Sequence, residues 1–188
     1  YFSHQEGRDI ILTGSERMQE RPIKILVEAL RSIGASISYQ KREGYPPLII
    51  HGKKLSGGMV KLPADISSQY ISALLLIAPG LSNGLKLNLE GGITSKPYIE
   101  MTLNLLNEIG VSSIFSNHKI EIFSSKKVND KIIEVESDWS SASYFYSIVA
   151  LSNNMTITLK NFKSHSFQGD SVLPTLFEPL GVKTYFNA

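Results

Sequence analysis

The chain has 188 residues, of which 42% are hydrophobic and 19% charged, and its formal net charge is +2. This composition predicts a soluble globular protein, and the even spread of both charge signs argues against a nucleic-acid surface. The absence of cysteine excludes disulfides and thiolate chemistry and fits a cytoplasmic protein, while the longest apolar run, residues 71–81, is too short to span a bilayer.

Hydrophobic periodicity predicts alternating strands and helices over the first two thirds of the chain. We expect strands at residues 10–13, 35–39, 48–51, 59–62, 85–89, 111–115 and 119–123. We expect helices at residues 22–33, 67–78 and 97–109, the second of them apolar on nearly all sides and therefore a core helix. Residues 14–20 read as a polar loop, and the strands at 35–51 and 111–123 form hairpins.

After a polar segment at residues 126–130, the rest of the sequence predicts further strands and helices. A strand at 132–135 precedes an apolar helix that opens at residues 138–143 and runs to Leu151. A strand at 155–159 and a helix at 172–180 follow, and Pro179 should fray the end of that helix. The last expected strand is 182–186.

These elements form an internal repeat of strand, helix, strand, helix, strand, strand. Helices end alike at Gly34, Gly110 and Gly181, and the serine pair Ser67-Ser68 recurs as Ser140-Ser141. About two and a half copies are present, with mixed α and β content that argues against a solenoid. The sequence therefore predicts a pseudo-symmetric α/β fold built from βαβαββ units.

The polar residues at the predicted helix starts form a candidate anion-binding set, because such starts present free N–H groups and a positive dipole end. Its members are Arg21, Ser67, Ser68, Gln69, Ser95 and Tyr98. Simpler interpretations remain open. Ser67 could be only an N-cap, Arg21 a solvated surface residue, and Tyr98 a residue that packs beside its helix. Asp138 reads as an N-cap or a catalytic carboxylate, and Ser140-Ser141 as a structural echo of the first serine pair.

At these residues the chain resembles the enolpyruvyl transferases, and among them the EPSP synthase family. The matching motifs run along essentially the whole chain: Leu12-Thr13-Gly14, Glu20-Arg21-Pro22-Ile23, Tyr45-Pro46-Pro47-Leu48, Ser67-Ser68-Gln69, Ser95-Lys96-Pro97-Tyr98-Ile99, Ser140-Ser141-Ala142-Ser143-Tyr144-Phe145 and Gln168-Gly169-Asp170. The resemblance implies an inside-out α/β barrel of two lobes, here incomplete. Residues 1–137 would be most of one lobe and residues 138–188 the first part of the second.

The same resemblance implies a transferase of the shikimate pathway, which leads to chorismate and the aromatic amino acids. It would move the enolpyruvyl (carboxyvinyl) group of phosphoenolpyruvate to the 5-hydroxyl of shikimate 3-phosphate and release phosphate, with no metal or cofactor. Ser67, Ser68 and Ser95 would hold the phosphate of shikimate 3-phosphate, and Tyr98 would line its ring. Gln69 would lie between the two substrates, and Arg21 would hold phosphoenolpyruvate.

Several family motifs have no counterpart here, including those that carry the acid–base chemistry. We therefore expect a fragment of less than half of the enzyme, with no catalytic residue of its own. Alone it should be inactive and self-associate through exposed apolar surface, whereas its parent should be a monomer. Two alternatives stay open: a UDP-N-acetylglucosamine enolpyruvyl transferase, and a non-catalytic phosphate-binding or assembly module of the same fold.

Overall fold

The structure is a computed structural model, and it describes residues 1–65, 67–94, 96–125 and 130–187. The chain divides into two compact units, Tyr1–Asn129 and Asp130–Ala188. Among the described residues we find no helix with the length and hydropathy of a membrane span.

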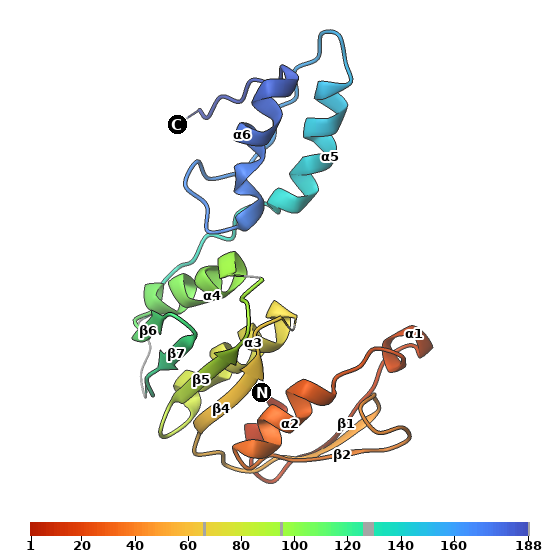
Figure 1. Ribbon diagram of the computed structural model, residues 1–188, viewed down its shortest axis with the longest axis vertical. Helices are drawn as coiled ribbons and strands as arrows, with labels where there is room; N and C mark the ends of the chain where they lie inside the picture. The colour runs from red at the N-terminus through yellow and green to blue at the C-terminus, as the bar shows by residue number, and fades with distance from the viewer. Residues whose placement is uncertain (66, 95, 126–129, 188) are drawn as a thin grey trace. The chain divides into compact units, whose positions relative to one another are not determined.

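The first unit contains two sheets and three longer helices (Figure 1). Its elements are η1 Phe2–His4, β1 Asp9–Leu12, α1 Glu16–Gln19, α2 Lys24–Ser32, β2 Ser36–Tyr39, β3 Leu48–His51, β4 Gly58–Pro63, α3 Ser68–Ile77, η2 Ala78–Gly80, β5 Leu85–Glu90, α4 Lys96–Glu108, β6 Ser113–Ser116 and β7 Lys119–Ile122. The α/β fold class and both hairpins, β2–β3 and β6–β7, are as predicted from the sequence.

The sheet topology confirms the internal repeat within the first unit. One sheet has the order β1-β3-β2 and the other β4-β5-β7-β6, so β5-β7-β6 repeats the order of the first sheet. All pairings in these triplets are antiparallel. A longer helix, α2 or α4, precedes the second strand of each triplet, and the short helix α1 also lies between β1 and β2. Strand β4 adds to the second sheet by a parallel pairing with β5.

Glycines end the helices where the sequence predicted. Gly34, Gly110 and Gly181 have φ angles of 100°, 89° and 85°, the left-handed region that glycine enters without steric cost. The turn of the β6–β7 hairpin uses Asn117, at φ 53°, a region that asparagine tolerates better than most residues. The local sequence signals therefore set these boundaries correctly.

Three details of the first unit differ from the sequence prediction. Helix α2 begins at Lys24 and not at Pro22, because the Ile23 N–H donates to the Gly44 carbonyl, 2.8 Å away, and Ile23 has non-helical angles. The expected loop at 14–20 contains the short helix α1. Helix α3 is not buried on all sides: Leu74 and Leu75 are fully buried, whereas Leu76 is 62% exposed.

One continuous core joins the helices of the first unit to both sheets. Helices α3 and α4 contribute buried residues such as Leu74 and Leu103, and the sheets contribute residues such as Ile50 and Leu87. A buried polar contact lies between the helices, where the Ser72 and Thr102 hydroxyls are 2.9 Å apart. Thr102 in turn donates to the Tyr98 carbonyl, so the start of α4 is tied to α3.

All regular elements in the described residues of the second unit are helical. Its elements are α5 Trp139–Ala150, η3 Gly169–Val172, α6 Leu173–Phe177 and η4 Glu178–Leu180. Trp139 is buried and packs edge-on against Phe162, with ring centroids 4.9 Å apart. The predicted fraying at Pro179 is present as the 3-10 turn η4.

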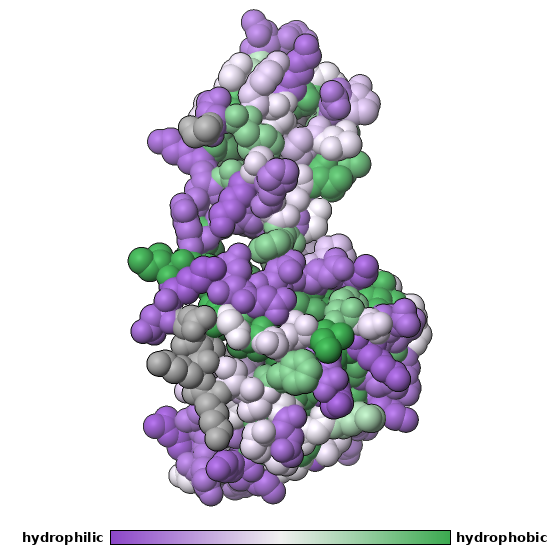
Figure 2. All heavy atoms as spheres, turned by 90° about the vertical axis from the view of Figure 1, so that its left-hand side faces the viewer, coloured by the Kyte–Doolittle hydropathy of each residue, from purple (hydrophilic) through white to green (hydrophobic). Residues whose placement is uncertain are grey.

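The strands predicted at 132–135, 155–159 and 182–186 are absent from the described residues of this unit. A strand needs a neighbouring strand to complete its ladder of hydrogen bonds, and periodicity alone supplies none. Residues 135–137 instead make isolated bonds to Asn161, whose carbonyl accepts from Ser137 N at 2.7 Å. Apolar side chains lie at the surface among hydrophilic ones (Figure 2). Tyr144 of α5 and Leu151, the C-cap of that helix, are among the exposed apolar residues. Self-association stays a prediction.

Candidate functional site

Two helices of the first unit begin at the same sheet edge. Strands β4 and β5 are parallel, Pro63 pairs with Glu90 at their ends, and the Ala64 N–H donates to the Glu90 carbonyl at 2.8 Å. Helix α3 follows β4 and helix α4 follows β5. Because the carboxyl ends of parallel strands meet at one edge, the amino ends of both helices lie there (Figure 1). This is where an α/β sheet commonly binds ligands.

The serine pair and Gln69 form the first turn of α3. Ser67 is the N-cap, and its Oγ accepts a hydrogen bond from Gln69 N at 3.3 Å, so the N-cap interpretation is confirmed. The role is compatible with anion binding, because a hydroxyl whose oxygen accepts a capping bond still has a hydrogen that can donate. Ser67 and Gln69 are exposed and Ser68 is half-buried. The helix dipole adds a partial positive charge at this end.

Helix α3 also makes hydrogen bonds that lead to the segments containing Arg21 and Tyr98. The Tyr70 hydroxyl donates to the carbonyl of Pro22, the residue after Arg21. The Ser72–Thr102 contact ties α3 to the first turn of α4, where Tyr98 is 40% exposed. The structure therefore gathers the Arg21, Gln69 and Tyr98 segments around α3. Ser95 lies outside the described residues.

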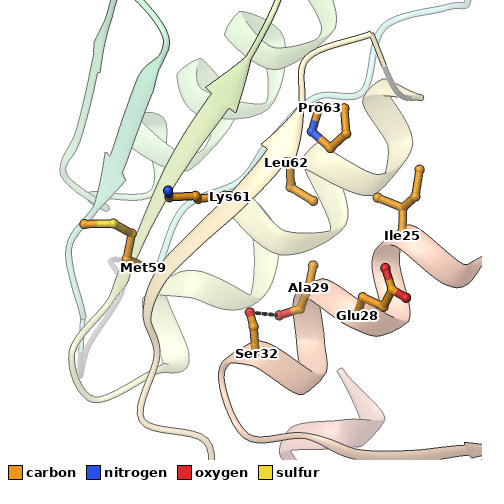
Figure 3. A pocket seen from close by; sticks show the side chains of 8 residues that line it. All are labelled: Ile25, Glu28, Ala29, Ser32, Met59, Lys61, Leu62 and Pro63. Carbon is orange, nitrogen blue, oxygen red and sulfur yellow. Dashed lines mark hydrogen bonds between the residues drawn. The ribbon is translucent and has the colours of Figure 1, made fainter.

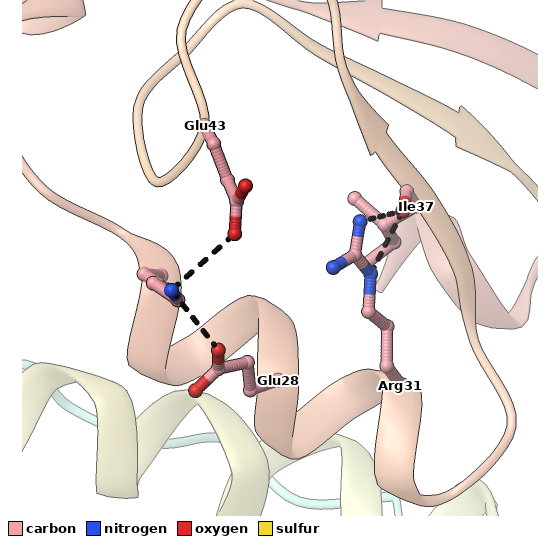
Figure 4. Close-up of polar contacts among 5 residues, drawn as sticks. Glu28, Arg31, Ile37 and Glu43 are labelled. Carbon is pink, nitrogen blue, oxygen red and sulfur yellow. Dashed lines mark hydrogen bonds and ion pairs between the residues drawn. The ribbon is translucent and has the colours of Figure 1, made fainter.

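Arg21 differs from the other cations of this region. Lys24 pairs with Glu43 at 3.3 Å and Glu28 at 3.7 Å, and the bond to Glu43 raises the pKa of this lysine (Figure 4). Arg31 donates to the Ile37 carbonyl from Nε and Nη2, at 2.9 and 2.6 Å. Arg21 is exposed, and among the described residues its guanidinium has no hydrogen-bond or salt-bridge partner. Its fork of donors remains available for a carboxylate or phosphate.

A separate pocket lies between α2 and β4 (Figure 3). It has a volume of about 480 Å³ and is lined by Ile25, Glu28, Ala29, Ser32, Met59, Lys61, Leu62 and Pro63. None of the predicted site residues lines it. The candidate site is therefore the open surface at the helix starts and not this pocket. In the part of the chain that the structure describes, no cluster of three His, Asp or Glu residues is arranged to hold a metal ion.

The model of the EPSP synthase (3-phosphoshikimate 1-carboxyvinyltransferase) family matches residues 1–184. The chain belongs to the EPSP synthase family. A 3-phosphoshikimate 1-carboxyvinyltransferase of Bacteroides fragilis strain YCH46 is 48% identical over 187 residues, covering 100% of this chain and 45% of the relative. That of Mannheimia haemolytica is 39% identical, over 95% of this chain and 41% of the relative.

Solved structures agree with this family assignment. An EPSP synthase from Acinetobacter baumannii superposes with a TM-score of 0.65 and 27% identity, over 80% of this chain and 33% of the other. A second structure of the Acinetobacter enzyme, at 2.37 Å, gives a TM-score of 0.63 over 77% of this chain. The chain thus spans less than half the length of the relatives it matches.

In this member of the family, the second serine pair has different surroundings from the first. Asp138 is the N-cap of α5: its Oδ1 accepts from Ser140 N at 3.0 Å, and its Oδ2 accepts from Ser141 Oγ at 2.7 Å. The Ser140 hydroxyl donates to Asp170. Two carboxylates therefore occupy the start of α5 and repel an anion. This supports the N-cap interpretation of Asp138 and the structural one of Ser140-Ser141.

We expect Asp138 to make the stability of the second unit pH-dependent. Bonds from the Ser141 hydroxyl and the Ser140 amide lower the pKa of Asp138 below its ordinary 3.8. A lowered folded-state pKa means that the contribution is present above pH 3.8 and is lost as the pH falls through the folded-state value. Urea titrations between about pH 2 and pH 7, followed by Trp139 fluorescence, measure it. Trp139 is suitable because it is the only tryptophan and adjoins Asp138.

The matched control for this prediction is Asp138→Asn. Asparagine is an equally good N-cap but does not titrate, so the acid loss of stability should be smaller in this variant than in the wild type. Other carboxylates titrate equally in both proteins and cancel in the comparison. An identical pH dependence in the two proteins would show that Asp138 does not contribute.

Proposed function

We propose that this chain is part of a full-length parent enzyme that transfers the enolpyruvyl group of phosphoenolpyruvate to the 5-hydroxyl of shikimate 3-phosphate. Membership of the EPSP synthase family supports this proposal. The observation that carries it is the start of α3, where Ser67 and Gln69 are exposed, Ser68 is half-buried, and the next residue, Tyr70, bonds to the Arg21 segment. Two anionic substrates require two such anion-binding elements close together.

The proposed roles follow from the chemistry of each group. Ser67, Ser68 and Ser95 donate to the phosphate of shikimate 3-phosphate, aided by the dipoles of α3 and α4. Arg21 binds phosphoenolpyruvate through its paired donors, Gln69 lies between the two substrates, and Tyr98 lines the shikimate ring. The start of α3 is exposed, and the Arg21 guanidinium lacks a partner among the described residues.

The reaction adds the 5-hydroxyl oxygen to C2 of phosphoenolpyruvate while its methylene carbon gains a proton. The tetrahedral intermediate then loses phosphate and a methyl proton, which restores the double bond. A general acid and a general base must move these protons. We assign neither role to this chain, so we expect the 188 residues alone to be inactive. We also propose that residues 1–137 and 138–188 belong to different lobes of a monomeric cytoplasmic parent.

Phosphate release tests the proposal directly. The full-length parent is incubated with phosphoenolpyruvate and either shikimate 3-phosphate or UDP-N-acetylglucosamine, and phosphate is measured continuously. We expect release with shikimate 3-phosphate only. Release with the nucleotide sugar alone would identify the sister enolpyruvyl transferase. Release with neither acceptor would indicate a non-catalytic member of the fold.

A further inference from the structure

Tyr70 makes a long-range contact beside the proposed substrate-binding residues. Its hydroxyl donates to the Pro22 carbonyl at 2.5 Å, and the two residues are 48 positions apart in sequence. Tyr70 lies one residue after Gln69 on α3, and Pro22 lies one residue after Arg21. The contact therefore joins the backbone next to Arg21 to the helix that begins with Ser67, Ser68 and Gln69.

The Pro22 carbonyl is a suitable point at which to hold Arg21. The bond is made to the backbone, so it fixes the Pro22–Ile23 peptide, one residue after Arg21, without using the guanidinium. The segment is also held on either side, by Arg21 N to the Met18 carbonyl at 3.3 Å and by Ile23 N to the Gly44 carbonyl at 2.8 Å. The acceptors of these two bonds lie in α1 and in the loop between β2 and β3. The Tyr70 bond instead runs to α3.

We propose that Tyr70 is a positioning residue that holds Arg21 at a set distance from Ser67, Ser68 and Gln69. The inference rests on the proposed function, in which Arg21 binds phosphoenolpyruvate and the α3 residues bind the acceptor. A tyrosine suits this task because its rigid ring has only two side-chain torsions and carries its donor at the far end. Tyr70 acts through Arg21 and does not itself touch substrate.

The test is Tyr70→Phe in the full-length parent, because this change removes the hydroxyl and keeps the ring. We expect the KM for phosphoenolpyruvate to rise about 3- to 10-fold, the effect of losing one hydrogen bond. The KM for shikimate 3-phosphate and kcat should stay within about twofold, since the α3 contacts are unchanged. Equal increases in both KM values, or none, would overturn the proposal.

Tyr39→Phe is the matched control. The Tyr39 hydroxyl is buried in the same unit and has no hydrogen-bond partner among the described residues. Removing it deletes the same atom without breaking a bond, so neither KM should change. A rise in the KM for phosphoenolpyruvate in Tyr39→Phe as large as in Tyr70→Phe would show a general effect of hydroxyl loss and would overturn the assignment.

A double-mutant cycle shows whether Tyr70 acts through Arg21. With alanine in place of Arg21, Tyr70→Phe should have no further effect on phosphoenolpyruvate affinity, because the group it positions is gone. Additive effects would overturn the proposal. Amide hydrogen exchange keeps this test apart from the proposed function: Tyr70→Phe should speed exchange at Arg21 and Ile23 even if the wild type releases no phosphate. Unchanged exchange there would contradict the structural link.

Discussion

Replacing both Ser67 and Ser68 with alanine should lower kcat/KM for shikimate 3-phosphate in the parent enzyme by roughly 10²- to 10⁴-fold. Each serine is proposed to donate one hydrogen bond to a charged phosphate, and such bonds contribute about 1.5–3 kcal/mol each. Every 1.4 kcal/mol or so corresponds to a factor of ten. Steady-state phosphate release at varied shikimate 3-phosphate measures the loss.

The N-cap role of Ser67 requires a separate control, because Ser67→Ala also removes the bond from Gln69 N. Ser67→Asp keeps a carboxyl oxygen for that cap and should leave thermal stability nearly unchanged. Its negative charge opposes a phosphate, so activity should fall at least as far as with alanine. Normal kcat/KM in Ser67→Asp would reduce Ser67 to a helix cap.

Replacing Leu74 with alanine should destabilise the first unit by about 2–5 kcal/mol, because it removes a fully buried side chain and leaves a cavity. That loss is a large part of the roughly 5–15 kcal/mol that holds an ordinary domain together. Urea denaturation followed by far-UV circular dichroism is the appropriate measurement. Trp139 fluorescence would report only the second unit.

Leu76→Ala is the matched control for Leu74→Ala. Both residues lie in α3, and both changes are leucine to alanine, so the difference in helix propensity cancels. Leu76 is 62% exposed, and its loss should cost less than about 1 kcal/mol. Equal destabilisation by the two variants would show that the exposed face of α3 is covered in the protein measured.

The sequence predicted most of the first unit because its signals are local. The left-handed glycines at Gly34 and Gly110 end their helices whatever the rest of the chain does. The β6–β7 hairpin follows from two short strands joined through Asn117. The repeat was equally readable, since similar units must place similar residues at similar positions.

The strands of the second unit could not be predicted in the same way. Residues 155–159 and 182–186 have apolar patterns, but a strand also needs a partner to complete its hydrogen-bond ladder, and no strand pairs with them in the described residues. Which residues of α3 are buried could not be predicted for a similar reason. Composition shows that Leu74 and Leu76 are equally apolar, and only packing decides which of them faces the core.

By itself, the sequence determined the α/β class, the repeat, the helix boundaries at glycine, and the residues Arg21, Ser67, Ser68, Gln69 and Tyr98 as a candidate anion set. Tertiary structure alone decided that α3 links the Arg21 and Tyr98 segments, through Tyr70 and through the Ser72–Thr102 contact. The physical reason is the separation in sequence between the interacting residues. Caps and turns depend on neighbours in sequence, whereas a hydrogen bond across 48 positions exists only after the chain has folded.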